Sequence, residues 1–178
     1  TVFAGFLGPA ELGCMSIILQ TCALLYMIPL GLSVATASLV GNALGAGKKK
    51  LAVQFGHIAI NVIICIALAA GIFIYFGSEY IFLVFTSDES ILRVIDPVVP
   101  CIPLFFLFDC VQGVSAGVLR GAGQQYIGAV TNLISFYPIA LPIAWLLCFN
   151  AKLNVIGLML GISCGTGLQS LATSALIY

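Results

Sequence analysis

The sequence predicts an all-α, polytopic membrane protein built as a helical bundle. Hydrophobic residues make up 62% of the 178 residues and charged residues only 7%, whereas soluble domains contain roughly 45–50% and 25%. The mean hydropathy of +1.22 agrees with this composition. A soluble fold could not cover its surface with so few polar side chains, so we expect the chain to lie in a bilayer.

The spacing of the charges predicts where the helices lie. A helix needs about 20 apolar residues to cross a bilayer, and long charge-free runs cover residues 12–47, 51–77, 121–151 and 153–178. The apolar run around Asp109 adds one more. We therefore predict about five transmembrane helices, at about 14–43, 52–76, 88–118, 126–149 and 153–178.

The two ends of the chain suggest that it is a piece of a longer membrane protein. Residues 1–8 are predicted to be the end of a preceding helix, and the last residues, SALIY, stop within an apolar run. The start of the chain does not have the pattern of a signal peptide. We accordingly expect residues 1–178 to be part of a longer membrane protein.

The third predicted helix has a marked start and several candidate hinges. Residues 86–89 have the spacing of a capping box, with Thr86 three residues before Glu89, which predicts a helix start. The prolines that follow are expected to bend the helix before Asp109, since each removes an amide donor. A purely structural kink is the alternative interpretation. The candidate hinges in the whole chain are Pro29, Pro97, Pro100, Pro103 and Pro142.

Asp109 is the strongest functional signal in the sequence. It lies in the middle of the apolar run VVPCIPLFFLFDCVQGVSAGVL, and nothing nearby in sequence neutralises it. An acid at the centre of a membrane helix costs about 2.5–3.5 kcal/mol on insertion scales. Such residues usually face a water-filled cavity or another polar helix, so Asp109 is predicted to be a proton or cation site.

Other polar residues within the spans are candidates for the wall of the same cavity. Asp109, Gln112, Gly113 and Ala116 share one helical face, because residues three and four apart lie on the same side. Each polar residue could instead be a hydrogen-bonding contact between helices, worth about 0.6 kcal/mol on average. The cavity candidates are Gln112, Gln20, Asn132 and Tyr137.

Several other functions are excluded by the motifs. Residues 41–48 resemble a phosphate-binding loop but lack its spacing. The seven cysteines form no CxxC pair and are scattered through apolar spans, so they predict neither a metal site nor a disulfide framework. No nucleophile and base can be paired, and three adjacent lysines are too few for a nucleic-acid surface. We predict no enzyme activity, cofactor, metal or nucleic-acid partner.

The basic residues predict the orientation in the membrane. Lys48, Lys49 and Lys50 follow the first complete span, and Arg120 follows the third. Lysine and arginine accumulate in cytoplasmic loops, so both loops are expected in the cytoplasm and the loop at 87–90 outside. Both basic loops also contain a Gly-Ala-Gly turn, at 45–47 and 121–123. This weak internal repeat suggests two helical hairpins of one design.

Two stretches resemble the multidrug and toxin extrusion transporters, especially their eukaryotic branch. YMIPLGLSVATASLVGNALGAGKKKLA is similar to the family's V-G-N-x-L-G-A-G region, and FDCVQGVSAGVLRGAGQQYIGAVTNLISFYPIALPIAWLLCF to its G-V-L-R-G-x-G-x-Q region. The resemblance implies the C-terminal lobe of a twelve-helix, two-lobed antiporter. It would export organic cations, drugs or metabolites in exchange for protons or sodium.

The resemblance also implies roles for individual residues and partners. The family's tenth-helix acid falls on Asp109, a glutamate of some animal members falls on Gln20, and the seventh-helix acid would lie before Thr1. The implied partners are a small-molecule substrate, a proton or sodium ion, membrane lipid and an N-terminal lobe of the same chain. The expected location is the plasma membrane or the vacuolar membrane. A lipid-linked precursor flippase of the same superfamily and a non-transporting membrane subunit are the alternatives.

Overall fold

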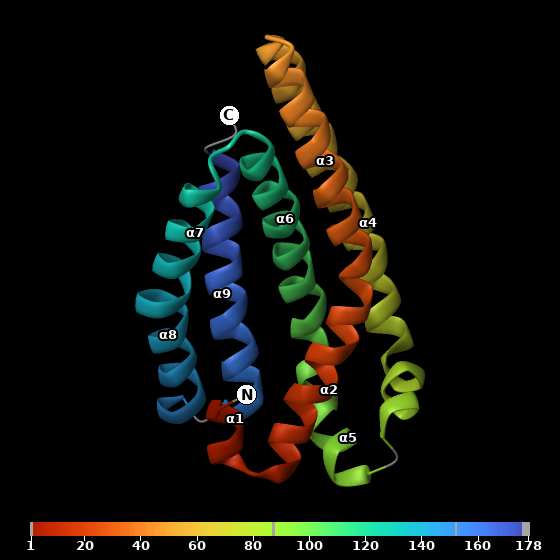
Figure 1. The fold of residues 1–178 in the computed structure, drawn as a ribbon. Helices are drawn as coiled ribbons and strands as arrows, with labels where there is room; N and C mark the ends of the chain where they lie inside the picture. Colours follow the sequence, from red (N-terminus) through yellow and green to blue (C-terminus); the bar gives the residue numbers. More distant parts are fainter. Residues whose placement is uncertain (1, 87, 152, 176–178) are drawn as a thin grey trace.

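A computed structural model describes residues 2–86, 88–151 and 153–175, and within them the chain is helical with no strand. The chain runs up and down through a bundle (Figure 1). Its elements are α1 (Val2–Leu7), α2 (Pro9–Leu25), α3 (Met27–Gly45), α4 (Lys49–Phe85), α5 (Glu89–Ile95), the 3₁₀ turns η1 (Asp96–Cys101), α6 (Ile102–Gly121), α7 (Gln125–Ile134), the π-helical η2 (Ser135–Ala140), α8 (Leu141–Trp145), the π-helical η3 (Leu146–Asn150) and α9 (Asn154–Ala175).

Five helical stretches in the described residues are long and apolar enough to cross a membrane. Large apolar side chains cover the outside of the bundle; Phe76 is 78% exposed and Val84 is 83% exposed. Such a surface is stable against lipid and unstable in water. The prediction of an all-α polytopic membrane fold is confirmed. The spans are Met27–Gly45, Lys49–Phe85, Glu89–Gly121, Gln125–Asn150 and Asn154–Ala175.

The first long span is divided at Tyr26, where the sequence predicted one helix over 14–43. Helix α2 ends at Leu25 and α3 begins at Met27. Pro29 has no amide hydrogen and cannot bond the carbonyl of Leu25, which explains an interruption one turn before it. Pro29 itself is buried in α3.

The two Gly-Ala-Gly turns have the same geometry. Gly47 and Gly123 take φ angles of +72° and +73°, the left-handed region that glycine enters without strain. In each turn the amide of the residue after this glycine donates to the carbonyl five residues earlier. The Lys48 amide donates to the Ala43 carbonyl, and the Gln124 amide donates to the Leu119 carbonyl. This is the Schellman arrangement that ends helices. Both turns therefore close α-helical hairpins, as the repeat suggested.

The outer loop differs in detail from the predicted capping box. Helix α5 begins at Glu89 as expected, but its N-cap is Asp88, whose carboxylate accepts from the Ser90 amide at 2.9 Å. Thr86 instead accepts from the Asp88 amide at 3.1 Å. Helix α4 extends to Phe85, past the predicted end at 76. Ser87 lies outside the described residues.

The prolines of the third span shape the entry into α6. Pro97 and Pro100 lie in the 3₁₀ turns of η1, and Pro103 lies in the first turn of α6. Proline fits the first turn of a helix because the amide there has no partner in any case. The α5–η1–α6 span thus changes its helical geometry just before the helix that holds Asp109. In the fourth span, Pro142 lies in the first turn of α8 between the two π-helical segments.

Helix α6 lies in the interior of the bundle and packs against α3, α4 and α9. Phe106, Cys110 and Val114 are buried on it and join the main core cluster. Helix α9 lies beside α8 at very short distance, since a Cβ on Gly161 would overlap Ala144. Small residues allow such close contact between membrane helices. These contacts hold α6 in the interior, where its polar residues face other helices.

Candidate functional site

The candidate site is centred on Asp109 in α6, where it is half-buried. Three groups lie around it: Cys22 of α2, Tyr26 between α2 and α3, and Cys110 of α6. Among the described residues no hydrogen bond or ion pair engages its carboxylate.

Tyr26 reaches this position because the chain is interrupted between α2 and α3. Its phenol lies against Gly113, one helical turn from Asp109 on α6. A Cβ atom at Gly113 would overlap the Tyr26 hydroxyl. The absence of a side chain at Gly113 thus makes room for the phenol beside the acid.

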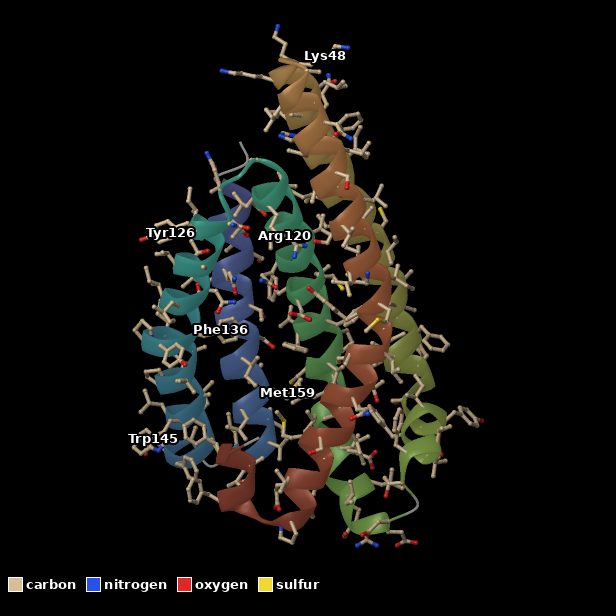
Figure 2. The ribbon with its side chains drawn as sticks, viewed as in Figure 1. Lys48, Arg120, Tyr126, Phe136, Trp145 and Met159 are labelled. Carbon is tan, nitrogen blue, oxygen red and sulfur yellow. The ribbon has the colours of Figure 1, made fainter. Side chains whose placement is uncertain are left out.

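Two hydrogen bonds continue this polar contact along α3 and α6. The Ser33 hydroxyl donates to the Gly113 carbonyl at 2.6 Å, and the same oxygen accepts from Nη2 of Arg120 at 2.9 Å. Gly117 permits this approach, since a Cβ there would overlap the Ser33 carbonyl. Arg120 lies near the end of α6 (Figure 2) and its charge also acts on Tyr26. A polar line therefore runs from Asp109 to the end of the helix.

The four predicted cavity residues differ in burial. Gln112 is half-buried on α6, whereas Gln20 on α2, Asn132 on α7 and Tyr137 in η2 are exposed. Within the described residues no hydrogen bond links any of these four to Asp109. The three exposed side chains face away from the core of the bundle, so they would line a cavity only together with further helices.

Tyr26 and Ser33 were not predicted as site residues, and Arg120 was expected only to orient the spans. One signal was available: Gly113, Gly117 and Gly121 recur every four residues on α6, a spacing that allows another helix to approach closely. That pattern could have indicated a partner helix without saying which one.

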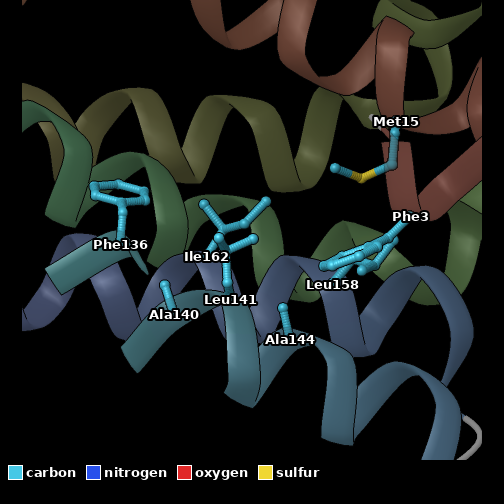
Figure 3. A pocket seen from close by; sticks show the side chains of 8 residues that line it. All are labelled: Phe3, Met15, Phe136, Ala140, Leu141, Ala144, Leu158 and Ile162. Carbon is cyan, nitrogen blue, oxygen red and sulfur yellow. The ribbon is translucent and has the colours of Figure 1, made fainter. Parts of the chain in front are cut away.

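A separate cavity of about 240 Å³ lies between α1, α2, α8 and α9 (Figure 3). Its lining is apolar and contains no titratable group among the described residues. In the same part of the chain, no three acidic, cysteine or histidine side chains gather in a way that could hold a metal ion. The cavity is lined by Phe3, Met15, Phe136, Ala140, Leu141, Ala144, Leu158 and Ile162.

Comparison with known proteins gives the family. The family model for MatE matches residues 1–146. The chain belongs to the MatE family. It is 42% identical over 159 residues to Multidrug and toxin extrusion protein 1 of the rabbit, Oryctolagus cuniculus, covering 89% of this chain and 28% of the relative. The chain thus spans less than a third of the curated relative it matches.

Solved MatE structures have the same fold as this chain. The eukaryotic MATE transporter AtDTX14 matches with a TM-score of 0.87 at 29% identity, over 94% of this chain and 38% of that one. A mutant of the Vibrio cholerae MATE transporter VcmN matches with a TM-score of 0.91 at 18% identity, over 99% and 40%. MatE proteins are multi-pass membrane transporters and not enzymes. The chain is accordingly an integral membrane protein, as its composition predicted.

Proposed function

We propose that this MatE chain is the C-terminal lobe of a secondary antiporter that exports organic cations, drugs or metabolites in exchange for protons or sodium. Asp109 is the coupling carboxylate. Its full partners are a small-molecule substrate, the driving ion, membrane lipid and an N-terminal lobe of the same protein. The membrane is the plasma membrane or the vacuolar membrane.

The observation that carries the proposal is the unpaired state of Asp109 in a membrane helix. It lies in the interior span α6, half-buried, without a hydrogen-bond or ion-pair partner in the described residues. A structural acid in a membrane is expected to be paired, because an unpaired one costs several kcal/mol. An acid that must release and rebind its ligand is expected to lack a permanent partner.

The chemistry of exchange follows from having one carboxylate. Asp109 can hold a proton or a cation at one time, so loading one displaces the other. Tyr26, between α2 and α3, offers a neutral oxygen atom one helical turn from Asp109, and hard cations are bound by oxygen ligands. We propose that Gln112, Gln20, Asn132 and Tyr137 contact the substrate when the second lobe completes the cavity.

The test uses the full-length protein in proteoliposomes with an imposed pH or sodium gradient. Asp109→Asn keeps the shape and removes the charge, so we expect gradient-driven efflux of a fluorescent organic cation to be lost. Membrane insertion should be retained, since a neutral amide is less costly to bury than an acid. The gradient that drives wild-type efflux identifies the coupling ion.

Asp96→Asn is the matched control, because Asp96 is an exposed aspartate in η1 at the outer end of the same span. It should transport like the wild type. If Asp109→Asn exports substrate at the wild-type rate with unchanged gradient dependence, Asp109 is structural and the proposed mechanism is wrong.

A further inference from the structure

A groove opens between α3 and α6 at the end of the bundle that carries the basic loops. Its volume is about 440 Å³, and it is lined by Val34, Ala37, Ser38, Gly41, Arg120 and Gly121. The positions of the lysines and Arg120 predict that this end is cytoplasmic. The groove begins at the last turn of α6 and reaches Val34, the residue next to Ser33.

Beyond the groove, the same interface leads to the coupling acid. Helices α3 and α6 run in the same direction (Figure 1), so Ala37 meets Gly121, Ser33 meets Gly117, and Tyr26 meets Gly113. Asp109 lies one turn further on α6. The hydrogen bond between Arg120 and Ser33, at 2.9 Å, therefore lies between the inner end of the groove and Asp109.

Arg120 brings a permanent positive charge to this point. A guanidinium is not deprotonated in proteins and has five N–H donors. The Nη2 atom of Arg120 donates to the Ser33 hydroxyl oxygen. In the described residues the one ion pair joins Arg93 to Glu89, so no carboxylate neutralises Arg120. Arginine near a helix end commonly extends toward water. Arg120 is exposed at the groove, and its Nη2 donates to Ser33 of α3.

We propose that Arg120 excludes cations from the α3–α6 groove. This inference rests on the function proposed above, in which Asp109 is the coupling carboxylate. Its charge repels protons and small cations that enter from the predicted cytoplasmic side, and the bond to Ser33 holds it in their path. Positive groups at a constriction exclude cations in this way in other membrane pathways. Asp109 is then loaded only through the transport cavity, which prevents ion leak without substrate.

The experiment measures proton leak in the full-length protein reconstituted into vesicles with an internal pH-sensitive dye. A pH gradient is imposed without substrate, with potassium and valinomycin present to clamp the voltage, and its collapse is followed. Arg120→Gln should collapse the gradient about tenfold faster than the wild type, equivalent to about 1.4 kcal/mol of barrier. Arg120→Lys keeps the charge and should remain close to the wild type.

Two variants serve as controls. Arg93→Gln removes an exposed arginine from the other end of the same span and should leave the leak unchanged. The double variant Arg120→Gln/Asp109→Asn should not leak, because the route is proposed to pass through Asp109. Equal amounts of reconstituted protein and equal melting temperatures in detergent show that a change in leak is not unfolding.

A second measurement needs no change at Arg120. Ser38→Cys places a thiol in the groove and Val53→Cys places one on the exposed face of α4. An anionic thiosulfonate reagent should modify Ser38→Cys faster than a cationic one, by comparison with the ratio at Val53→Cys. Equal ratios at the two positions would show that the groove does not exclude cations.

The outcomes separate this inference from the proposed function. A tight Arg120→Gln variant together with an inactive Asp109→Asn variant overturns the role of Arg120 and leaves the antiporter proposal standing. A fully active Asp109→Asn variant overturns the antiporter mechanism itself.

Discussion

The phenol of Tyr26 occupies the space that a side chain at position 113 would fill. Tyr26 interrupts the helix between α2 and α3, while Gly113 lies on α6 one turn from Asp109. The Gly113 carbonyl also accepts a hydrogen bond from Ser33 at 2.6 Å. One glycine therefore receives two groups of the neighbouring span, and this contact sets the surroundings of the acid.

Gly113→Ala is expected to destabilise the lobe and to displace Tyr26. The new methyl group would overlap the Tyr26 hydroxyl and approach its ring, and overpacking of this kind costs about 1–3 kcal/mol. Thermal unfolding of the full-length protein in detergent measures the loss. Tyr26→Phe removes the overlapping oxygen, so the double variant should recover part of the stability.

Gly31→Ala is the matched control for that substitution. A Cβ at Gly31 of α3 meets no atom within 4 Å, so it should leave stability unchanged or raise it slightly through helix propensity. Equal melting temperatures for Gly113→Ala and the wild type would contradict the close contact between Tyr26 and Gly113.

Protonation of Asp88 in acid is expected to lower the stability of the start of α5. The hydroxyl of Ser90, bonded at 2.6 Å, and then its amide hold the pKa of the Asp88 carboxyl below the ordinary value of 3.8. A lowered pKa contributes stability that is present above 3.8 and is lost as the pH falls through the folded-state pKa. Asp88→Ala should therefore lower the melting temperature at pH 7, and the difference should shrink at pH 3 and below.

Asp88→Asn separates the charge from the cap. Asparagine retains an oxygen that accepts from the Ser90 amide, so this variant should keep most of the stability and lose the pH dependence. A constant difference between Asp88→Ala and the wild type across the acid range would show that the charge of Asp88 contributes nothing.

Cysteine labelling tests the orientation in the membrane. We expect Lys49→Cys, at the tip of the α3–α4 hairpin, to be shielded from an impermeant thiol reagent in intact cells, and Glu89→Cys, at the start of α5, to react. Both positions are exposed. The less buried native cysteines, Cys65, Cys101 and Cys164, are replaced first. Reaction of Lys49→Cys from outside would reverse the predicted topology.

The positions of the spans could be predicted from sequence because insertion in a bilayer depends on local composition. The break at Tyr26 was not predicted, although Pro29 supplied its cause three residues later. The end of α4 at Phe85 was also missed, because the prediction ended the helix before the first charge at Glu79. A helix need not stop where the apolar run stops, since its backbone hydrogen bonds continue in water.

The sequence by itself determined that this protein lies in a membrane, and it identified Asp109 as the acid with the highest cost of burial. Both conclusions depend on the transfer of single residues from water to lipid, which neighbours in sequence reveal. Only the tertiary structure decided that Tyr26, Ser33 and Arg120 share an interface with that acid. Their contacts depend on the distance between α3 and α6, which small residues set and which the order of residues along one helix does not contain.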